Sequence, residues 1–438
     1  MIVLKRFQLG LIHAAVAITL VPINSTLNRI MIEDFGLAAS LVVLLFSFPY
    51  LLSFVQVAIG SFSDHHPILG YRRSPYILIG LLFCVTGLLL STQVAQLLVT
   101  NFWAGLALGL LTFGAWGMGF NFASVAYFSI ASEISSQGGR AKTTALMFFV
   151  MIVSIILTAA GLSRMLEPFT PERLDSAFRT VALLALAMGL LGLIGLERRS
   201  AAPAASEARY NLRLIYSEIT ASPQVKYFFL YLILMLAAIL GQDVLLEPFA
   251  ARAFDLTVSA TTRITSIWGG FYLLSLVLAG LLEDRFPKIK VVRLSAWLAI
   301  GAFVVVALSG PLRSQPLFYT GVVLLGLATG PATVSNLSLM LEMTVPGKIG
   351  LFIGAWGSAS ALARLLGSFT TALVRDLARY SPAGALFGYM AGFLALAAFL
   401  YLSLVVLRRI RLVEFLRQAE LPAYQSSVIE RASLGGEA

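Results

Sequence analysis

Apolar runs about 20 residues long, the length a helix needs to cross a bilayer core, recur along nearly the whole chain. Only 12% of the residues are charged, against about 25% in soluble domains. The sequence therefore predicts an all-α polytopic membrane protein with about twelve transmembrane helices. The approximate bounds of these spans are 9–31, 38–62, 75–98, 102–130, 142–166, 177–196, 226–249, 262–283, 291–310, 316–342, 349–375 and 384–407.

The lysines and arginines lie mainly in loops on one side of these predicted spans. Because cytoplasmic loops carry an excess of Lys and Arg, we expect both termini on the cytoplasmic side. The predicted domains are two six-helix halves, 1–196 and 226–407, a cytoplasmic linker at 197–225 and a cytoplasmic tail at 408–438. The same placement in short loops, rather than binding of nucleic acid, explains the net charge of +10.

The chain has one cysteine, Cys84, and three histidines. Disulfide frameworks and cysteine-based metal sites need more cysteines than this, so both are excluded. The sequence also lacks a nucleophile elbow, a Gly-rich phosphate loop and a cluster of metal ligands. We therefore expect a protein that is not an enzyme and that has no redox cofactor or dedicated metal site.

Two short patterns occur once in each half of the chain. Gly60–Asp64 and Gly280–Asp284 each end a predicted span before basic residues, at an offset of 284 − 64 = 220 residues. An acid followed by a glycine and a cation occurs at Glu133–Arg140 and Glu342–Lys348, where the acids are 342 − 133 = 209 residues apart. Such repeats predict two halves in parallel orientation, as in transporters of the major facilitator superfamily.

The segment from Gly60 to Arg73 resembles the loop signature of that superfamily, lengthened here by several residues. Gly and Asp four residues apart share one helix face, and the glycine lets another helix approach closely. We expect a cytoplasmic latch or gate built from Gly60, Asp64, Arg72, Arg73, Glu133, Arg140, Asp284, Arg285, Glu342 and Lys348. The two glutamates are expected to pair with Arg140 and Lys348 or with a loop of the opposite half. Topology-setting charges and ordinary surface salt bridges are the alternatives.

Four stretches resemble a narrower family, PucC/LhaA: Ser25–Ile32 (STLNRIMI), Phe48–Leu51 (FPYL), Ile59–Ile77 (IGSFSDHHPILGYRRSPYI) and Met343–Gly357 (MTVPGKIGLFIGAWG). The resemblance covers most of the chain. It implies an assembly factor in a photosynthetic membrane that binds chlorophyll or bacteriochlorophyll as cargo. The implied partners are light-harvesting or photosystem apoproteins, and pigment-synthesis enzymes are further candidates.

A magnesium chlorin needs an apolar cleft, an axial nitrogen or oxygen ligand and donors for its ring carbonyls. His13 is the only histidine within a predicted span, so it is the candidate axial ligand. For His13 the alternative is a hydrogen bond between helices. For aromatic candidates such as Trp116, the alternative to lining a chlorin is ordinary packing. The predicted pigment- or substrate-binding residues are His13, Asn24, Asn28, Arg29, Asn121, Trp116 and Arg364.

Ionisable side chains inside membrane spans are costly and are by default functional candidates. Asp243 and Glu247 are four residues apart on one predicted helix face, where they could hold a proton. Arg364 lies deep in a span and is expected to pair with an acid. For Glu247, snorkelling to the outer interface is the favoured alternative. These charges keep a second function open, a proton-coupled small-molecule transporter of the major facilitator superfamily.

Overall fold

The computed structural model describes residues 2–55, 59, 62–63, 66–135, 140–197, 199, 223–282, 285–342, 349–378 and 384–410. Most of the predicted linker, nearly all of the predicted tail, and the gate residues Gly60, Asp64, Asp284 and Lys348 lie outside these ranges. For Arg140 and Glu342 only the backbone is described.

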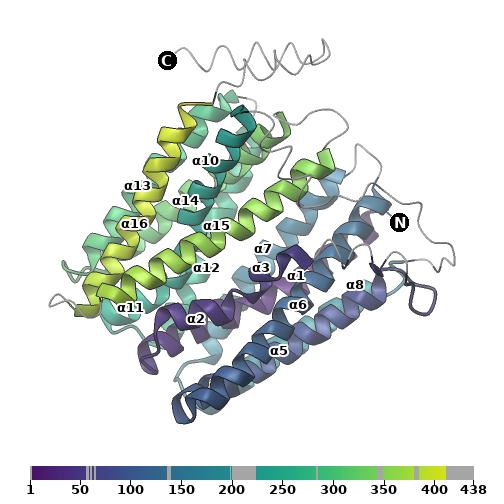
Figure 1. Ribbon diagram of the computed structural model, residues 1–438, viewed down its shortest axis with the longest axis horizontal. Coiled ribbons are helices and arrows are strands. Elements are labelled where there is room, and N and C mark those ends of the chain that lie inside the picture. The colour runs from purple at the N-terminus through teal and green to yellow at the C-terminus, as the bar shows by residue number, and fades with distance from the viewer. Residues whose placement is uncertain are drawn as a thin grey trace. The chain divides into compact units, whose positions relative to one another are not determined.

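The described chain is helical, as predicted, and forms two compact units (Figure 1). The first unit comprises Met1–Arg209 and Ala250–Ser266, and the second comprises Tyr210–Phe249 and Ile267–Ala438. The predicted division at a central linker stays a prediction.

The helices of the first unit begin with a span that changes its winding. The π-helices η1 (Pro22–Leu27) and η2 (Ile30–Asp34) follow α1 (Ile2–Ile18). Such π-helical turns often occur at functional sites. The remaining helices in chain order are α2 (Ala39–Phe46), α3 (Phe48–Leu51), η3 (Ser53–Val55), α5 (Ser74–Thr100), α6 (Phe102–Ile134), α7 (Arg140–Met165) and α8 (Pro171–Leu193).

The helices of the second unit also begin with an interrupted span. It consists of α10 (Pro223–Gly241), the 3₁₀ turn η5 (Gln242–Val244) and α11 (Leu246–Phe254), whose last residues belong to the first unit. The remaining helices are α12 (Val258–Leu282), whose residues up to Ser266 belong to the first unit, α13 (Lys288–Ser309), α14 (Gln315–Glu342), α15 (Ile349–Ala378) and α16 (Gly384–Leu407).

Ten helices in the described part of the chain are long and apolar enough to cross a membrane. Two predicted spans are not among these ten. The one at 38–62 is divided into short helices around Ser47 and Pro49. The one at 349–375 lies in α15, which is rich in Gly, Ala and Ser and carries Arg364.

Close helix packing within each unit comes from small residues. In the first unit α5 packs along α6, and α1 packs against α7 and α8 (Figure 1). A Cβ atom added to Gly80 of α5 would lie 2.6 Å from the backbone of Gly119 and Ala123 in α6. In the second unit α10 packs against α15 and α16, and α13 packs against α14 and α16. This use of small residues is typical of helices in lipid, where close backbone approach replaces hydrophobic burial as the force for association.

Candidate functional site

A cluster of charged side chains joins three helix ends in the first unit, and we call it the arginine–glutamate cluster. It consists of Arg72 and Arg73 before α5, Glu133 at the end of α6 and Glu197 after α8. The Glu133 carboxylate is 3.9 Å from Nη2 of Arg72 and 3.8 Å from Nε of Arg73. Nη1 of Arg73 donates a hydrogen bond of 2.7 Å to Oγ of Ser63.

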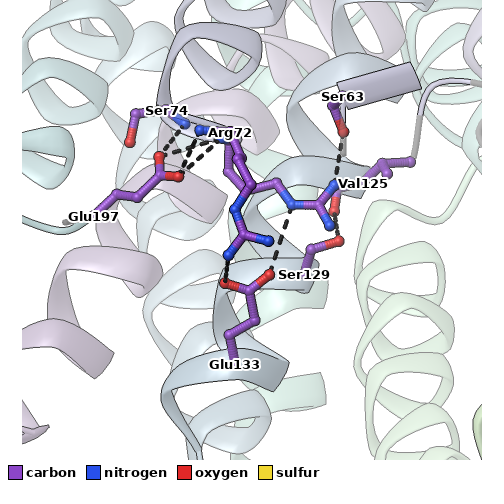
Figure 2. Close-up of polar contacts among 8 residues, drawn as sticks. Ser63, Arg72, Ser74, Val125, Ser129, Glu133 and Glu197 are labelled. Atoms are coloured by element: carbon purple, nitrogen blue, oxygen red, sulfur yellow. Dashed lines mark hydrogen bonds and ion pairs between the residues drawn. The ribbon is translucent and has the colours of Figure 1, made fainter. Parts of the chain in front are cut away.

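The side chain of Glu197 binds the backbone at the start of α5. Its carboxylate accepts hydrogen bonds from the N–H groups of Arg72 (2.8 Å), Arg73 (3.1 Å) and Ser74 (2.7 Å). Figure 2 shows this carboxylate facing the backbone of residues 72–74 and the Glu133 carboxylate facing Arg72. The first N–H groups of a helix have no partner within the helix, and an anion there is favoured by the helix dipole. Glu197, which follows α8, therefore caps the N-terminus of α5.

The described part of the predicted latch contains ion pairs that were not expected. Glu133 was expected to pair with Arg140 or with a loop of the opposite half. Its pairing with Arg140 stays a prediction, because the side chain of Arg140 lies outside the described residues, while Arg72 and Arg73 are partners that the expectation did not include. The end of α6 and the loop before α5 lie at the same end of the first unit, so these arginines are within reach of Glu133. The side chain of Arg285, also predicted for the gate, belongs to the second unit. A gating role for these residues stays a prediction.

His13 lies in an aromatic cage between α1, α6 and α7. Its ring centroid is 5.1 Å from that of Tyr127, 5.6 Å from Phe128 and 5.0 Å from Phe148. The imidazole is 6% exposed, and it makes a hydrogen bond to the backbone of Met147. Its Nδ1 has no hydrogen-bond partner among the described residues. One ring nitrogen is therefore held by the backbone while the other is unused.

The other pigment-site candidates of the first unit have different surroundings. Trp116 is fully buried, and its Nε1 donates to Oγ1 of Thr19 over 3.4 Å, which favours the packing alternative. Asn121 is also fully buried, and its Nδ2 donates to the carbonyl oxygens of Pro49 (3.1 Å) and Gly117 (2.8 Å). The bond to Pro49 satisfies a carbonyl of the short helix α3, so Asn121 stabilises an interrupted span.

Three further candidates lie on the π-helical part of the first span. Asn24 is partly exposed and Asn28 is buried. Arg29 is 8% exposed and forms an ion pair with Asp34 through Nη1. Its Nη2 donates to the carbonyl oxygen of Leu256 over 3.4 Å. Arg29 therefore connects the end of the first span with the segment before α12.

Arg364 forms an ion pair within the second unit. Its Nη1 lies 2.8 Å from Oδ2 of Asp243, and the two side chains are 20% and 35% exposed. The pair joins α15 to η5 where the seventh span is interrupted. Close backbone contact supports it, because a Cβ atom on Gly367 would lie 2.0 Å from the carbonyl oxygen of Ala237.

Two expectations about the acids of the seventh span are wrong. Asp243 and Glu247 do not share one face of a continuous helix, because α10 ends at Gly241 and α11 begins at Leu246. Glu247 does not snorkel to an interface, since its side chain is buried with 3% exposure. Glu247 is the second residue of α11, after the interruption, and it lies among the buried residues of that helix.

Comparison with known proteins identifies the family of this chain. A family model described as "PUCC protein" matches residues 26–415. The chain belongs to the PUCC family. It is 27% identical to the "Bacteriochlorophyll synthase 44.5 kDa chain" of Rhodobacter capsulatus, over 90% of this chain and 92% of that one. It is 25% identical to "Protein PucC" of Cereibacter sphaeroides, over 92% of this chain and 91% of that one.

Solved structures with the same fold are transporters. A bacterial homologue of the human lysosomal transporter Spinster, inward-facing and occupied, matches with a TM-score of 0.72 at 15% identity, over 95% of this chain and 98% of that one. The nucleoside transporter NupG matches with a TM-score of 0.71 at 14% identity, over 93% and 98%. These likenesses confirm the major facilitator fold for this PUCC-family chain.

Family and fold together establish a PucC-type integral membrane protein. The ten apolar helices and the relatives from phototrophic purple bacteria support the predicted location in a photosynthetic membrane. The relatives and the transporter neighbours favour a protein that is not an enzyme, although one relative bears the name of a synthase chain.

Glu197 is the residue of this PUCC-family site that sequence reasoning missed. A signal was present at the start of α5, where the N-cap residue is Arg73, whose side chain has no acceptor atom. The sequence RRSP before an apolar run therefore calls for an acceptor from elsewhere. The sequence does not reveal which of the acids supplies it, because Glu197 is 124 residues away along the chain.

Replacing Glu197 by alanine is expected to lower the free energy of unfolding of the purified protein by about 1–3 kcal/mol, because three part-buried N–H groups lose a charged acceptor. Glu133→Ala is the matched control. The ion pairs of Glu133 are longer than the hydrogen bonds of Glu197, and the Glu133 side chain is 45% exposed. Its replacement is therefore expected to lower the free energy of unfolding by less than about 1 kcal/mol. Thermal unfolding in detergent measures both, and equal losses for the two variants would contradict the capping role of Glu197.

Proposed function

We propose that this PUCC-family protein is a membrane assembly factor that binds chlorophyll or bacteriochlorophyll and delivers it to light-harvesting or photosystem apoproteins. One relative, the "Bacteriochlorophyll synthase 44.5 kDa chain" of Rhodobacter capsulatus, carries a name that points to pigment biosynthesis. The fold alone supports only a membrane protein of transporter type, since one fold hosts many functions.

The observation that carries the proposal is the hydrogen bonding of the two ring nitrogens of His13. Histidines that bind metals usually donate their other ring nitrogen to a backbone carbonyl or a carboxylate, which fixes the tautomer and the ring orientation. The hydrogen bond of His13 to the backbone of Met147 supplies such a second contact, and Nδ1 is left as the candidate ligand atom for the magnesium of a chlorin.

The cage around His13 also supports a chlorin site. Phe128 is 39% and Phe148 is 42% exposed, so two of the three rings that cover the imidazole lie partly at the surface of the unit. Nδ1 is buried in this structure, so a flat apolar ligand would reach it by displacing these partly exposed rings. Aromatic rings are also suitable neighbours for a macrocycle, because they prefer offset or edge-on contacts with other rings.

The proposal is tested by purifying the wild-type protein in mild detergent from pigment-rich membranes of a phototroph and measuring bound pigment by absorption. We expect pigment to co-purify, and His13→Leu to carry about tenfold less, a loss equivalent to ~1.4 kcal/mol of binding. His66→Leu is the matched control, because His66 lies in an exposed loop. A colourless wild-type protein would overturn the function, while equal pigment in both variants would remove His13 as the ligand.

A second function, proton-coupled transport of a small molecule, is supported by the Arg364–Asp243 pair. The pair lies at an interrupted span, and transporters often place substrate and ion sites at such interruptions. If the purified protein were colourless and moved a soluble solute into liposomes with a proton gradient, this second function would replace the first.

A further inference from the structure

The segment before α5 carries large apolar side chains that are exposed on the first unit. Leu69 is 84% exposed, Phe62 54% and Ile68 38%, and we call these three residues the apolar tip. Tight turns favour Gly, Pro, Asn, Asp and Ser rather than large apolar residues. Contact of three such side chains with water is unfavourable, so the apolar tip is suited to an apolar environment outside the described part of the chain.

The backbone of this segment forms a tight turn at Leu69. The N–H group of Ile68 donates to the carbonyl oxygen of Tyr71 over 2.9 Å, and the N–H group of Tyr71 donates to the carbonyl oxygen of Ile68 over 3.0 Å. The φ angles of Leu69 and Gly70 are 54° and 80°, both positive as in a type I′ turn. Leucine rarely adopts a positive φ, whereas glycine and asparagine do so readily. A strained leucine at this position indicates that its side chain has a use.

The turn is held at both of its ends. On one side the Tyr76 hydroxyl donates a hydrogen bond of 2.8 Å to the carbonyl oxygen of His66, and the His66 ring stacks on the Phe62 ring at 4.2 Å between centroids. On the other side the Glu197 carboxylate binds the N–H groups of residues 72–74. The first unit therefore presents the apolar tip on an anchored loop.

The length of α5 places the apolar tip near the membrane surface. This helix begins at Ser74 and contains 27 residues, which at 1.5 Å per residue is about 40 Å. The hydrocarbon core of a bilayer is only about 30 Å thick, so the ends of α5 extend into the headgroup regions. Leu69 precedes Ser74 by 74 − 69 = 5 residues, a stretch that spans at most about 18 Å. The tip is therefore within reach of lipid headgroups.

The exposed charge beside the turn is positive. The guanidinium carbon of Arg199 lies 5.5 Å from the centroid of the Tyr71 ring, and Arg199 is exposed. The acids of the arginine–glutamate cluster are already paired with its arginines or with backbone N–H groups. Cations at a membrane surface attract anionic lipids, so Arg199 favours a negatively charged surface next to the tip.

We propose that the apolar tip inserts into an anionic phospholipid surface, with Leu69 among the upper parts of the acyl chains and Arg199 beside lipid phosphate. Apolar side chains next to cations at headgroup depth are the arrangement of segments that lie in a membrane interface. This arrangement favours a lipid surface over a protein partner as the occupant. The inference is independent of the pigment function, because its test measures lipid contact and not bound pigment.

The test places one fluorophore on Pro67→Cys in the full-length protein. Pro67 is exposed and is not part of the apolar tip, and the native Cys84 is 0% exposed, so it does not compete for the label. The protein is reconstituted into vesicles of phosphatidylcholine and phosphatidylglycerol in equal amounts, and spin-labelled lipids quench the fluorophore according to its depth. We expect a depth of about 5–10 Å below the headgroup surface. Glu172→Cys, at the exposed start of α8, is the control position and should stay in water.

Two variants separate the apolar from the electrostatic contribution. Leu69→Asn suits the positive φ but removes the apolar side chain, so the fluorophore at residue 67 should become as shallow as the one at residue 172. Thermal unfolding of this variant in detergent should be unchanged, which shows that the fold is intact. Phosphatidylglycerol carrying the spin label should quench about fivefold more than phosphatidylcholine carrying it. Arg199→Gln should abolish this preference, and Arg252→Gln, at an exposed position of α11, should retain it.

The results that would overturn the proposal are distinct. A fluorophore at residue 67 as shallow as the control, or a depth that Leu69→Asn leaves unchanged, would exclude insertion of the apolar tip. Equal quenching by the two spin-labelled lipids would exclude the role of Arg199 and of anionic headgroups. Protection of the fluorophore from iodide in native membranes, without quenching by lipid in vesicles, would assign the tip to a protein partner and overturn the lipid contact.

Discussion

Alanine at Gly367 is expected to destabilise the second unit by an amount at or above the upper end of the roughly 1–3 kcal/mol usual for overpacking. The added Cβ atom would lie 2.0 Å from the carbonyl oxygen and 2.8 Å from the carbonyl carbon of Ala237. Backbone atoms cannot rotate away as a side chain can, so α10 and α15 would have to separate. The hydrogen bond of 3.4 Å from Oγ1 of Thr371 to the carbonyl of Gly241 lies in the same contact.

The matched control for Gly367→Ala lies in the same helix. A Cβ atom on Gly357 would meet nothing within 4 Å among the described atoms. Alanine is favoured over glycine in a helix by about 1 kcal/mol, so Gly357→Ala should leave the stability unchanged or raise it. Thermal unfolding of the two purified variants in one detergent measures the difference. Similar midpoints for both would show that α10 and α15 do not pack as closely as the structure places them.

Replacing Arg364 by leucine is expected to lower the free energy of unfolding by about 2 kcal/mol. Removing one partner of a buried ion pair costs roughly 3–5 kcal/mol, and partial exposure of both side chains reduces this loss through solvent screening. The cost arises because the Asp243 carboxylate, 2.8 Å from Arg364, would remain inside a membrane span without this cation.

A double variant distinguishes loss of the ion pair from loss of packing. Arg364→Leu combined with Asp243→Asn removes both charges, so it should recover at least half of the stability lost in the single variant. Arg263→Leu is the control for removing an arginine from a span, because Arg263 is exposed on α12, and its effect should stay within about 0.5 kcal/mol. If the double variant were as unstable as the single one, the pair would not be the source of the loss.

The positions of the spans could be predicted well from the sequence. The last predicted span, 384–407, has the bounds of α16, and the span at 316–342 differs from α14 by one residue at its start. This agreement follows from the bilayer, which requires an apolar stretch of fixed length whatever the helix packs against. The family was predicted from its motifs, and the match over residues 26–415 confirms it.

The interruptions of the spans could not be predicted in the same way. The run from Pro223 through Val244 is apolar enough on average for one continuous span, so its mean hydropathy does not predict that α10 ends at Gly241. The end of α10 coincides with a close approach of α15, since a Cβ atom on Gly241 would lie 2.8 Å from the carbonyl carbon of Gly367, and such a contact is not visible in the sequence. The expected Asp243–Glu247 face failed for this reason.

The partners of the charged residues could not be predicted from the sequence either. Hydropathy predicts that Arg364 is inside a span and needs an acid, but several acids were available. Only packing within the second unit selected Asp243. In the same way, the start of α5 required an acceptor, and the approach of the end of α8 brought Glu197 to it.

The sequence by itself determined that this chain is a helical membrane protein of the PUCC family, because span length and local motifs are properties of contiguous residues. Only the tertiary structure decided that His13 lies in an aromatic cage, that Arg29 contacts the segment before α12 and that Glu197 caps α5. Each of these depends on side chains from distant segments, whose meeting is fixed by helix packing and by the need to satisfy polar groups away from water.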